Sequence, residues 1–266
     1  MPVRTEKAGH VWTVVLSRPQ QRNAVDRVHA EALFEAFLAF DRDADARVAV
    51  FWGEGGAFCA GWDLKSAADL DPSDPVGDIA VPADPDAPLP RGPMGPTRLE
   101  LAKPVIAAVE GPAVAGGMEL ALWADCRVLA EDAYFGVYCR RWGVPLIDGG
   151  TVRLPRLVGI GRALDIIMTG RQVPAEEAYR IGLAERLVPP GRARESAEAM
   201  AAEIARFPQG CMRADRRSAY AAWGASVREG LAREWDISSP LLRSEGIAGA
   251  GRFAAGKGRG GDFGEI

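Results

Sequence analysis

The stretch PVIAAVEGPAVAGGMELALWADC, residues 104–126, decides the fold class of this chain. Its first six residues, 104–109, form an apolar, β-branched run that ends at a glycine–proline break, which is typical of a buried strand. Residues 117–124 are apolar on every side except at one glutamate, the pattern of a buried helix. A buried strand that leads through a glycine turn into a buried helix indicates α/β architecture.

The segments before this stretch follow the same plan. VWTVVL, residues 11–16, and RVAVFW, residues 47–52, are two further short strands. Between them Asp26 has the position of a helix cap, and apolar side chains recur after it at helical spacing. Strands that alternate with helices favour a layered α/β fold over a helix bundle or a β-sandwich.

The remaining segments divide into a loop and a helical end. Residues 66–98 are dense in proline, aspartate and glycine, so we expect a long loop of the kind that forms lids or binding sites. Further on, Gly170 is expected to end a helix and Pro174 to open the next one. From Arg192 onward the chain is alanine-rich and helix-forming, with expected interruptions at Pro208 and Pro240.

Composition excludes several classes of function. The chain has 266 residues, a mass of 28.4 kDa and a formal net charge of -4, which supplies no global field for a polyanion, so nucleic acid is not expected as a partner. No apolar stretch reaches the roughly 20 residues needed to span a bilayer, and the N-terminus lacks an apolar signal-peptide core. The sequence therefore predicts a cytoplasmic protein without a membrane contact.

Few residue types remain for catalysis. The four cysteines lie far apart with no C-x-x-C pair, so neither a metal site nor a disulfide framework is expected. The two histidines, His10 and His29, occupy segments that favour structural roles. Because no G-x-S-x-G elbow is present either, proton chemistry in this chain would come mostly from carboxylates.

Glu119 is the strongest candidate. It stands in a helix that offers it no polar face, and an uncompensated buried carboxylate costs several kcal/mol at order of magnitude. A catalytic site explains its presence economically; the alternative is a structural pair with an arginine or with backbone amides. Gly116 and Gly117 come directly before it, so their amides would lie among the unpaired N–H groups of the first helical turn, which attract developing negative charge.

Two other segments carry acids in glycine-rich surroundings. GGAFCAGWDLK, residues 55–65, places Asp63 after a glycine turn, either exposed to a ligand or serving as a helix cap. Asp148 lies in PLIDGGT, where an aspartate before two glycines is usually a turn residue. The apolar residues around it suggest a partly buried turn, which would suit a catalytic acid.

Together these segments resemble the crotonase family, also called the enoyl-CoA hydratase/isomerase superfamily, over about residues 3–240. The resemblance is carried by SRPQQRNAVD (17–26), AFCAGWDLK (57–65), the block 103–130 around Glu119, and the block 153–188. It implies a crotonase-like spiral of ββα repeats in residues 1–195, followed by a C-terminal helical region, residues 196–266, that trimerises, commonly as a dimer of trimers.

The resemblance also implies roles for individual residues around a coenzyme A thioester. The backbone N–H groups of Trp62 and Gly116 would form an oxyanion hole, and a further set would line the CoA moiety: Arg22, Ala24, Asp63, Leu64 and Lys65. Glu119 matches the first of the two glutamates of typical hydratases. Cys139 stands where the second would fall, whereas Asp148 resembles an acid that dienoyl-CoA isomerases use.

Three functions follow as alternatives. The leading one is hydration of a 2-enoyl-CoA, in which Glu119 activates water and Asp148 assists proton delivery at Cα. The second is double-bond isomerisation of an enoyl-CoA or dienoyl-CoA by the same two acids. The third is an acyl-CoA-binding protein without efficient turnover, since Cys139 replaces an acid. None of the three requires a separate cofactor, because coenzyme A enters as part of the substrate. The sequence does not indicate which acyl chain the substrate carries.

Overall fold

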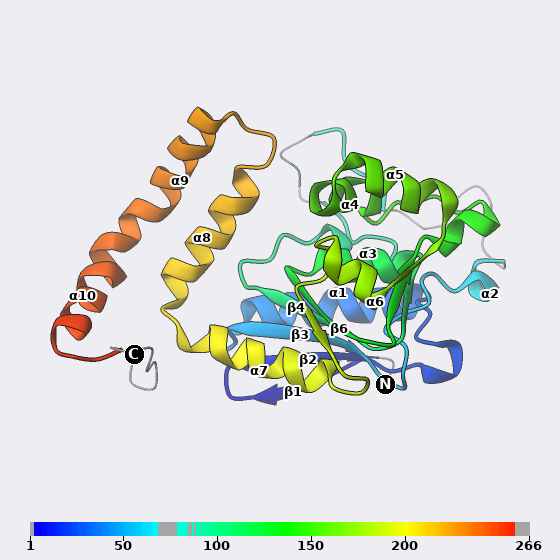
Figure 1. The fold of residues 1–266 in the computed structure, drawn as a ribbon, viewed down its shortest axis with the longest axis horizontal. Coiled ribbons are helices and arrows are strands. Elements are labelled where there is room, and N and C mark those ends of the chain that lie inside the picture. The colour runs from blue at the N-terminus through cyan, green and yellow to red at the C-terminus, as the bar shows by residue number, and fades with distance from the viewer. Residues whose placement is uncertain (1–2, 69–78, 85–86, 88, 259–266) are drawn as a thin grey trace. The chain divides into compact units, whose positions relative to one another are not determined.

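A computed structural model describes residues 3–68, 79–84, 87 and 89–258 (Figure 1). The chain separates into two compact units, one ending at Ala201 and the other starting at Ala202. The expected division between residues 195 and 196 falls inside a helix, α7 (Ala193–Arg206), that reaches into both units. The roles expected for the two parts stay predictions.

The first unit is built on a six-stranded sheet with the order β1-β2-β3-β4-β6-β9. Only the pair β1 and β2 is antiparallel, and each later pair is parallel. β2 and β4 are buried along their whole length, which explains their continuous apolar sequence. The strands are β1 (Val3–Ala8), β2 (Val11–Leu16), β3 (Val48–Gly53), β4 (Val105–Val109), β6 (Cys126–Ala130) and β9 (Arg186–Val188).

A second, three-stranded sheet has the order β5-β7-β8, with bounds Pro112–Val114, Tyr134–Gly136 and Gln172–Pro174. The chain passes from the large sheet to the small one and then into a helix, first as β4, β5 and α3 (Gly116–Trp123), then as β6, β7 and α4 (Gly150–Val158). This is the ββα repeat that the resemblance to the crotonase family implies. Because of the repeat, α3 packs against both β5 and α4.

Helix α1 (Arg27–Arg42) confirms the expected cap. The Asp26 side chain accepts a hydrogen bond from the backbone N–H of His29, and the His29 ring also contacts the same carboxylate. Leu33, Phe37 and Phe40 then form the buried face. His29 is thus held by a structural partner, as expected.

The segment 66–98 was expected to be one long loop. Residues 69–78, 85–86 and 88 lie outside the described residues. The described part contains only a short helix at its start, α2 (Leu64–Ala67), and a 3-10 turn at its end, Pro96–Arg98. Just before that turn, Gly92 and Gly95 exchange backbone hydrogen bonds of 2.8 and 2.9 Å, which closes a tight loop.

The helices after α4 match most of the expected boundaries. α5 (Ile160–Thr169) ends at Gly170, whose φ is +59°, and α6 (Ala175–Arg180) begins after Pro174. α8 (Gln209–Ala221) begins directly after Pro208.

The prediction that the helix is interrupted at Pro240 was wrong. α9 (Val227–Leu241) contains Pro240 and passes into a π-helical turn, Leu242–Gly246, and then into α10 (Ile247–Ala254). A proline removes one backbone hydrogen bond from the helix interior, and here α9 continues through Pro240 in spite of that loss. The remaining 3-10 segments are Pro19–Gln21 and Tyr138–Trp142. Within the described part of the chain, every helix is too short or too polar to serve as a membrane span.

Candidate active site

The backbone N–H of Trp62 is free of partners among the described residues. Val25 and Trp62 form an isolated parallel bridge, in which the Val25 N–H donates to Gly61 O at 2.8 Å and Val25 O accepts from the Asp63 N–H at 2.9 Å. In this bridge Val25 forms hydrogen bonds with Gly61 and Asp63, the two neighbours of Trp62, so the N–H of Trp62 itself points away from Val25. It is therefore open to an acceptor that is not part of the protein.

Gly116 supplies a second such group. It is the first residue of α3, where an N–H has no acceptor within the helix, and no other described residue accepts from it. A Cβ built on Gly61 would lie 3.0 Å from Gly116 N and 2.9 Å from Ala115 Cβ, so the Trp62 segment and the start of α3 are in contact. The fold thus brings two unpaired amides onto adjoining segments.

Ala115 shapes the start of α3. Its φ of +52° is unusual for a residue other than glycine, and its N–H donates to Gly136 O at 2.8 Å. This conformation turns the chain sharply between β5 and α3. Backbone in a sparsely populated region is commonly found at functional sites, where the surrounding structure holds it.

Glu119 lies one turn into α3 and is 3% exposed. Its Oε1 accepts the N–H groups of Asp148 at 2.9 Å and Gly150 at 2.8 Å. Its Oε2 accepts no hydrogen bond from any described residue and is not among the fully enclosed atoms that lack a partner. One oxygen therefore anchors the side chain, and the other is available to a ligand.

Asp148 is arranged in the same way and is also 3% exposed. Its Oδ1 accepts the Met94 N–H at 3.0 Å and a hydrogen bond from the Thr97 hydroxyl, whereas Oδ2 accepts none from the described residues. The Arg153 guanidinium donates to Asp148 O at 3.0 Å and to Thr97 O at 2.7 Å. Arg153 thereby ties the start of α4 to the loop that contains Thr97.

The pKa values of both carboxyls are raised. Burial and the negative charge of Asp148 raise the pKa of Glu119 to about 7, against the backbone hydrogen bonds from Gly150 and Asp148. Burial also raises the pKa of Asp148, opposed by the Thr97 hydroxyl and the Met94 N–H. A carboxyl such as Glu119, whose pKa lies near neutrality, can both give up and accept a proton there, which is the condition for acid–base catalysis.

Cys139 does not replace a carboxylate. It is buried, and burial followed by the charge of Glu119 raises the pKa of its thiol above the usual value. A neutral thiol is a weak proton donor. The nearby acid chemistry of this site therefore rests on Glu119 and Asp148.

Asp63 is a helix cap, which is one of the two interpretations that its sequence allows. Its carboxylate accepts the Lys65 and Ser66 N–H groups as the cap of α2 and pairs with Arg18 at 2.8 Å. Its side chain is therefore committed to structure. Leu64, which follows it, is exposed.

The other residues expected along CoA lie on the same two segments. Ala24 is buried, and its carbonyl accepts a hydrogen bond from Arg18. Arg22 is exposed, and its carbonyl accepts the Ala60 N–H at 2.9 Å. Residues 22–25 thus run beside residues 60–63, and Lys65 is exposed just beyond them.

Among the residues that the structure describes, no group of three or more His, Cys, Asp and Glu side chains could hold a metal ion.

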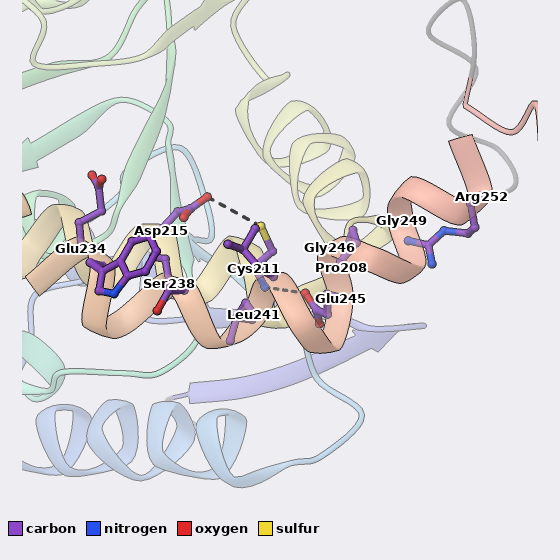
Figure 2. Close-up of a pocket in the computed structure, with 13 residues that line it drawn as sticks. Pro208, Cys211, Asp215, Glu234, Ser238, Leu241, Glu245, Gly246, Gly249 and Arg252 are labelled. Atoms are coloured by element: carbon purple, nitrogen blue, oxygen red, sulfur yellow. Dashed lines mark hydrogen bonds between the residues drawn. The ribbon is translucent and has the colours of Figure 1, made fainter. Parts of the chain in front are cut away.

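A cavity of about 380 Å³ lies within the second unit, between α8 and the helices after it (Figure 2). There Glu245 accepts the N–H groups of Gly210 and Cys211 at the start of α8, so this carboxylate holds the helices together.

Comparison with known proteins identifies the family of this chain. The profile of the enoyl-CoA hydratase/isomerase family matches residues 6–245. The chain is 38% identical over 195 residues to the enoyl-CoA hydratase EchA19 of Mycobacterium tuberculosis, covering 71% of this chain and 68% of that protein. It is 40% identical over 205 residues to the carnitinyl-CoA dehydratase of Salmonella arizonae, covering 76% of this chain and 74% of that one.

Solved structures give the same result. An enoyl-CoA hydratase from Mycobacterium tuberculosis superposes with a TM-score of 0.85 at 34% identity, covering 96% of both chains. An enoyl-CoA hydratase from Bacillus anthracis also reaches 0.85, at 30% identity and 96% of both chains. The chain belongs to the enoyl-CoA hydratase/isomerase family and has the crotonase fold.

Sequence reasoning missed part of the site. Met94, Thr97 and Arg153 all bond to the Asp148 segment, yet none was a candidate. Met94 and Thr97 lie at the end of the proline-rich loop, where composition predicts the absence of regular structure but not which residues fold back. The two glycines of this segment, Gly92 and Gly95, indicate a turn there but not its contact with Asp148.

Proposed function

We propose that this protein adds water across the 2,3 double bond of a 2-enoyl-CoA thioester. The observation that carries the proposal is a pair of unpaired amides on adjoining segments, one of them at the start of the helix that holds Glu119, together with a buried carboxylate pair in which each member has one oxygen free. The similarity to proteins named as a hydratase and as a dehydratase supports it, because the two names describe the same bond changes in opposite directions.

The N–H groups of Trp62 and Gly116 act on the thioester oxygen. When water adds at C3, negative charge develops on that oxygen, and two donors fixed in place stabilise the enolate without reorganising. Removal of one donor of this kind typically costs about 2.7 to 4 kcal/mol of transition-state stabilisation. Residues 22–24 and 63–65 are expected to lie along the CoA moiety, and no separate cofactor is needed.

The two carboxylates carry out the proton transfers. Oε2 of Glu119 takes a proton from the attacking water, so that the hydroxyl joins C3, and Asp148 delivers a proton from Oδ2 to C2. One water is consumed and the pair ends with the same number of protons. The proton gained then lies on Glu119 and must return to Asp148 before the next cycle, which starts with Glu119 ionised and Asp148 protonated. Burial raises the pKa of Asp148 and so favours its protonated form, and a pKa of about 7 lets Glu119 release its proton near neutrality.

Double-bond isomerisation is the second candidate, because Cys139 is a neutral thiol where a typical hydratase has its second acid. In that reaction Glu119 and Asp148 would move a proton between carbons, and no water would be added. The third candidate, acyl-CoA binding without turnover, predicts that Glu119→Gln and Asp148→Asn leave any weak activity unchanged.

Mass spectrometry separates these functions. Crotonyl-CoA and longer or branched 2-enoyl-CoA esters are incubated with the protein in ¹⁸O water, while enoyl absorbance is followed. Hydration predicts loss of absorbance and a product that has gained one labelled water. Glu119→Gln should reduce the rate by about 10²- to 10⁴-fold, whereas Glu131→Gln, at an exposed turn, should not. A product of unchanged mass would establish isomerisation instead, and no product from any ester would refute both reactions.

A further inference from the structure

The two carboxylates of the site accept four hydrogen bonds from the described residues, and three of these come from backbone amides. Asp148 and Gly150 donate to Glu119, and Met94 donates to Asp148. The fourth comes from a side chain, the Thr97 hydroxyl. Thr97 is 1% exposed, so water does not compete for this bond. It is the one donor to the pair that a substitution can remove without altering the backbone.

Gly92, in the surrounding loop, has no side chain that would block the hydrogen bond between Thr97 and Asp148. A Cβ built on Gly92 would lie 1.9 Å from Thr97 Oγ1 and 2.7 Å from Asp148 Oδ1, so no other residue could stand at position 92 without displacing one of them. The same loop places the Met94 sulfur 2.7 Å from a Cβ built on Gly116. One short segment, residues 92–97, therefore packs against both the start of α3 and Asp148.

We propose that Thr97 is a positioning residue for the reaction, which holds Asp148 by Oδ1 so that Oδ2 faces the substrate. The inference rests on the proposed function and deepens it. Because Oδ1 already accepts two hydrogen bonds, a proton on Asp148 occupies Oδ2, the oxygen free to meet the substrate. Without the hydroxyl, Oδ1 can take the proton instead and the carboxyl group can rotate.

The other charged and titratable groups around Asp148 are Glu119 from α3, Arg98 from the 3-10 turn, Arg153 from α4 and Cys59 from the loop before Gly61. These are unchanged when Thr97 is replaced by valine. The lost donor stabilised the charged form of Asp148, so the pKa of Asp148 rises. Because the two carboxyls titrate as a coupled pair, both limbs of the pH–rate profile move to higher pH.

Thr97→Val should lower kcat/KM by about tenfold to a hundredfold, with the loss mainly in kcat, and Thr97→Ser should restore both the rate and the profile. Thr13→Val is the matched control. Thr13 is also buried and donates to a carboxylate, Glu198 at 2.8 Å, but belongs to β2. It should leave the pH profile in place. In an Asp148→Asn background, Thr97→Val should cause little further loss.

A second measurement does not depend on turnover. Proteins labelled with ¹³C at the Asp and Glu carboxyl carbons are titrated by NMR, and the perturbed resonances are assigned with Asp148→Asn and Glu119→Gln. The titration of the pair should move to higher pH in Thr97→Val and return in Thr97→Ser. An unmoved titration, or equal losses from Thr97→Val with and without Asp148, would overturn the proposal. A protein whose pair titrates as expected but which converts no enoyl-CoA would refute the proposed function alone.

Discussion

Glu119 shows how a single residue can be costly for folding and useful for chemistry. Its helix provides no polar side chain, and among the residues that the structure describes its hydrogen-bond partners are the N–H groups of Asp148 and Gly150. Two backbone bonds satisfy one oxygen and leave the other for a ligand. The same division, one oxygen anchored and one free, recurs in Asp148, and it distinguishes this pair from the carboxylate of Asp63, which serves a cap and an ion pair.

The raised pKa of Glu119 has a consequence for stability. In the folded protein this carboxyl binds its proton more tightly than at its ordinary pKa of 4.5. The associated stability is fully present below pH 4.5 and is lost as pH rises through about 7. Relative to Glu119→Gln, the wild-type protein should therefore lose about 3 kcal/mol of unfolding free energy across this range.

Urea unfolding of both proteins at several pH values between 4.5 and 8.5 measures this difference. A constant difference across the range would contradict the raised pKa. Glu131→Gln provides the control, since an exposed glutamate should produce no trend in this range.

At the residue scale, the sequence indicates candidate residues whose polarity differs from that of their neighbours in the chain. Glu119 could be found because it is the one acid in an apolar helix, and Asp148 because apolar residues surround its turn. Thr97 and Arg153 could not be found, because a threonine or an arginine is ordinary in any segment. Their importance arises from a contact between a loop and the start of α4, more than 50 residues apart in sequence, which local patterns do not encode.

At the scale of elements, the contact between the Gly61 turn and the start of α3 positions the two free amides. Gly61→Ala should disrupt it, since the new Cβ would lie 2.9 to 3.0 Å from Ala115 and Gly116 at a φ of +92°. Gly56→Ala is the matched control, with a φ of +81° but no atom within 4 Å. Both variants should lose about 1 to 3 kcal/mol through backbone strain.

Only Gly61→Ala should also reduce kcat, by about 10²-fold or more if one donor is displaced. Stability is compared by thermal unfolding and activity with crotonyl-CoA. Equal kcat values in the two variants would show that the turn does not position the amide.

The elements themselves were largely predictable. Continuous apolar runs predicted β2 and β4, the Asp26 cap predicted the start of α1, and Pro208 predicted the start of α8. The continuation of α9 through Pro240 was not, because a proline can either end a helix or only remove one of its hydrogen bonds, and the local sequence does not distinguish the two outcomes. The proline-rich loop was predicted as a loop, but its Gly92–Gly95 closure required the fold around it.

At the scale of the whole molecule, the second unit presents many apolar side chains to solvent. Val227 is 81% exposed and Ile247 70%, and Leu231, Trp235, Leu242 and Phe253 are exposed as well. Exposed apolar surface on this scale marks an interaction site. We expect a second and third copy of the chain to cover it, as a homotrimer or a dimer of trimers.

Analytical ultracentrifugation measures this directly. The expected mass is three or six times 28.4 kDa. Ile247→Glu should reduce it, because a charge would be buried at the contact, whereas Val81→Glu, at an exposed valine of the first unit, should not. A monomeric wild-type protein would contradict the expectation.

The most direct test of the account is the thioester carbonyl itself. Isotope-edited infrared difference spectra are recorded for crotonyl-CoA labelled with ¹³C at the carbonyl, bound to Glu119→Gln so that turnover is slow. Donation from the Trp62 and Gly116 amides predicts a shift of the carbonyl stretch to lower frequency than in water, and a smaller shift in Gly61→Ala. A bound carbonyl with the same frequency as in water would contradict the proposed role of the two amides.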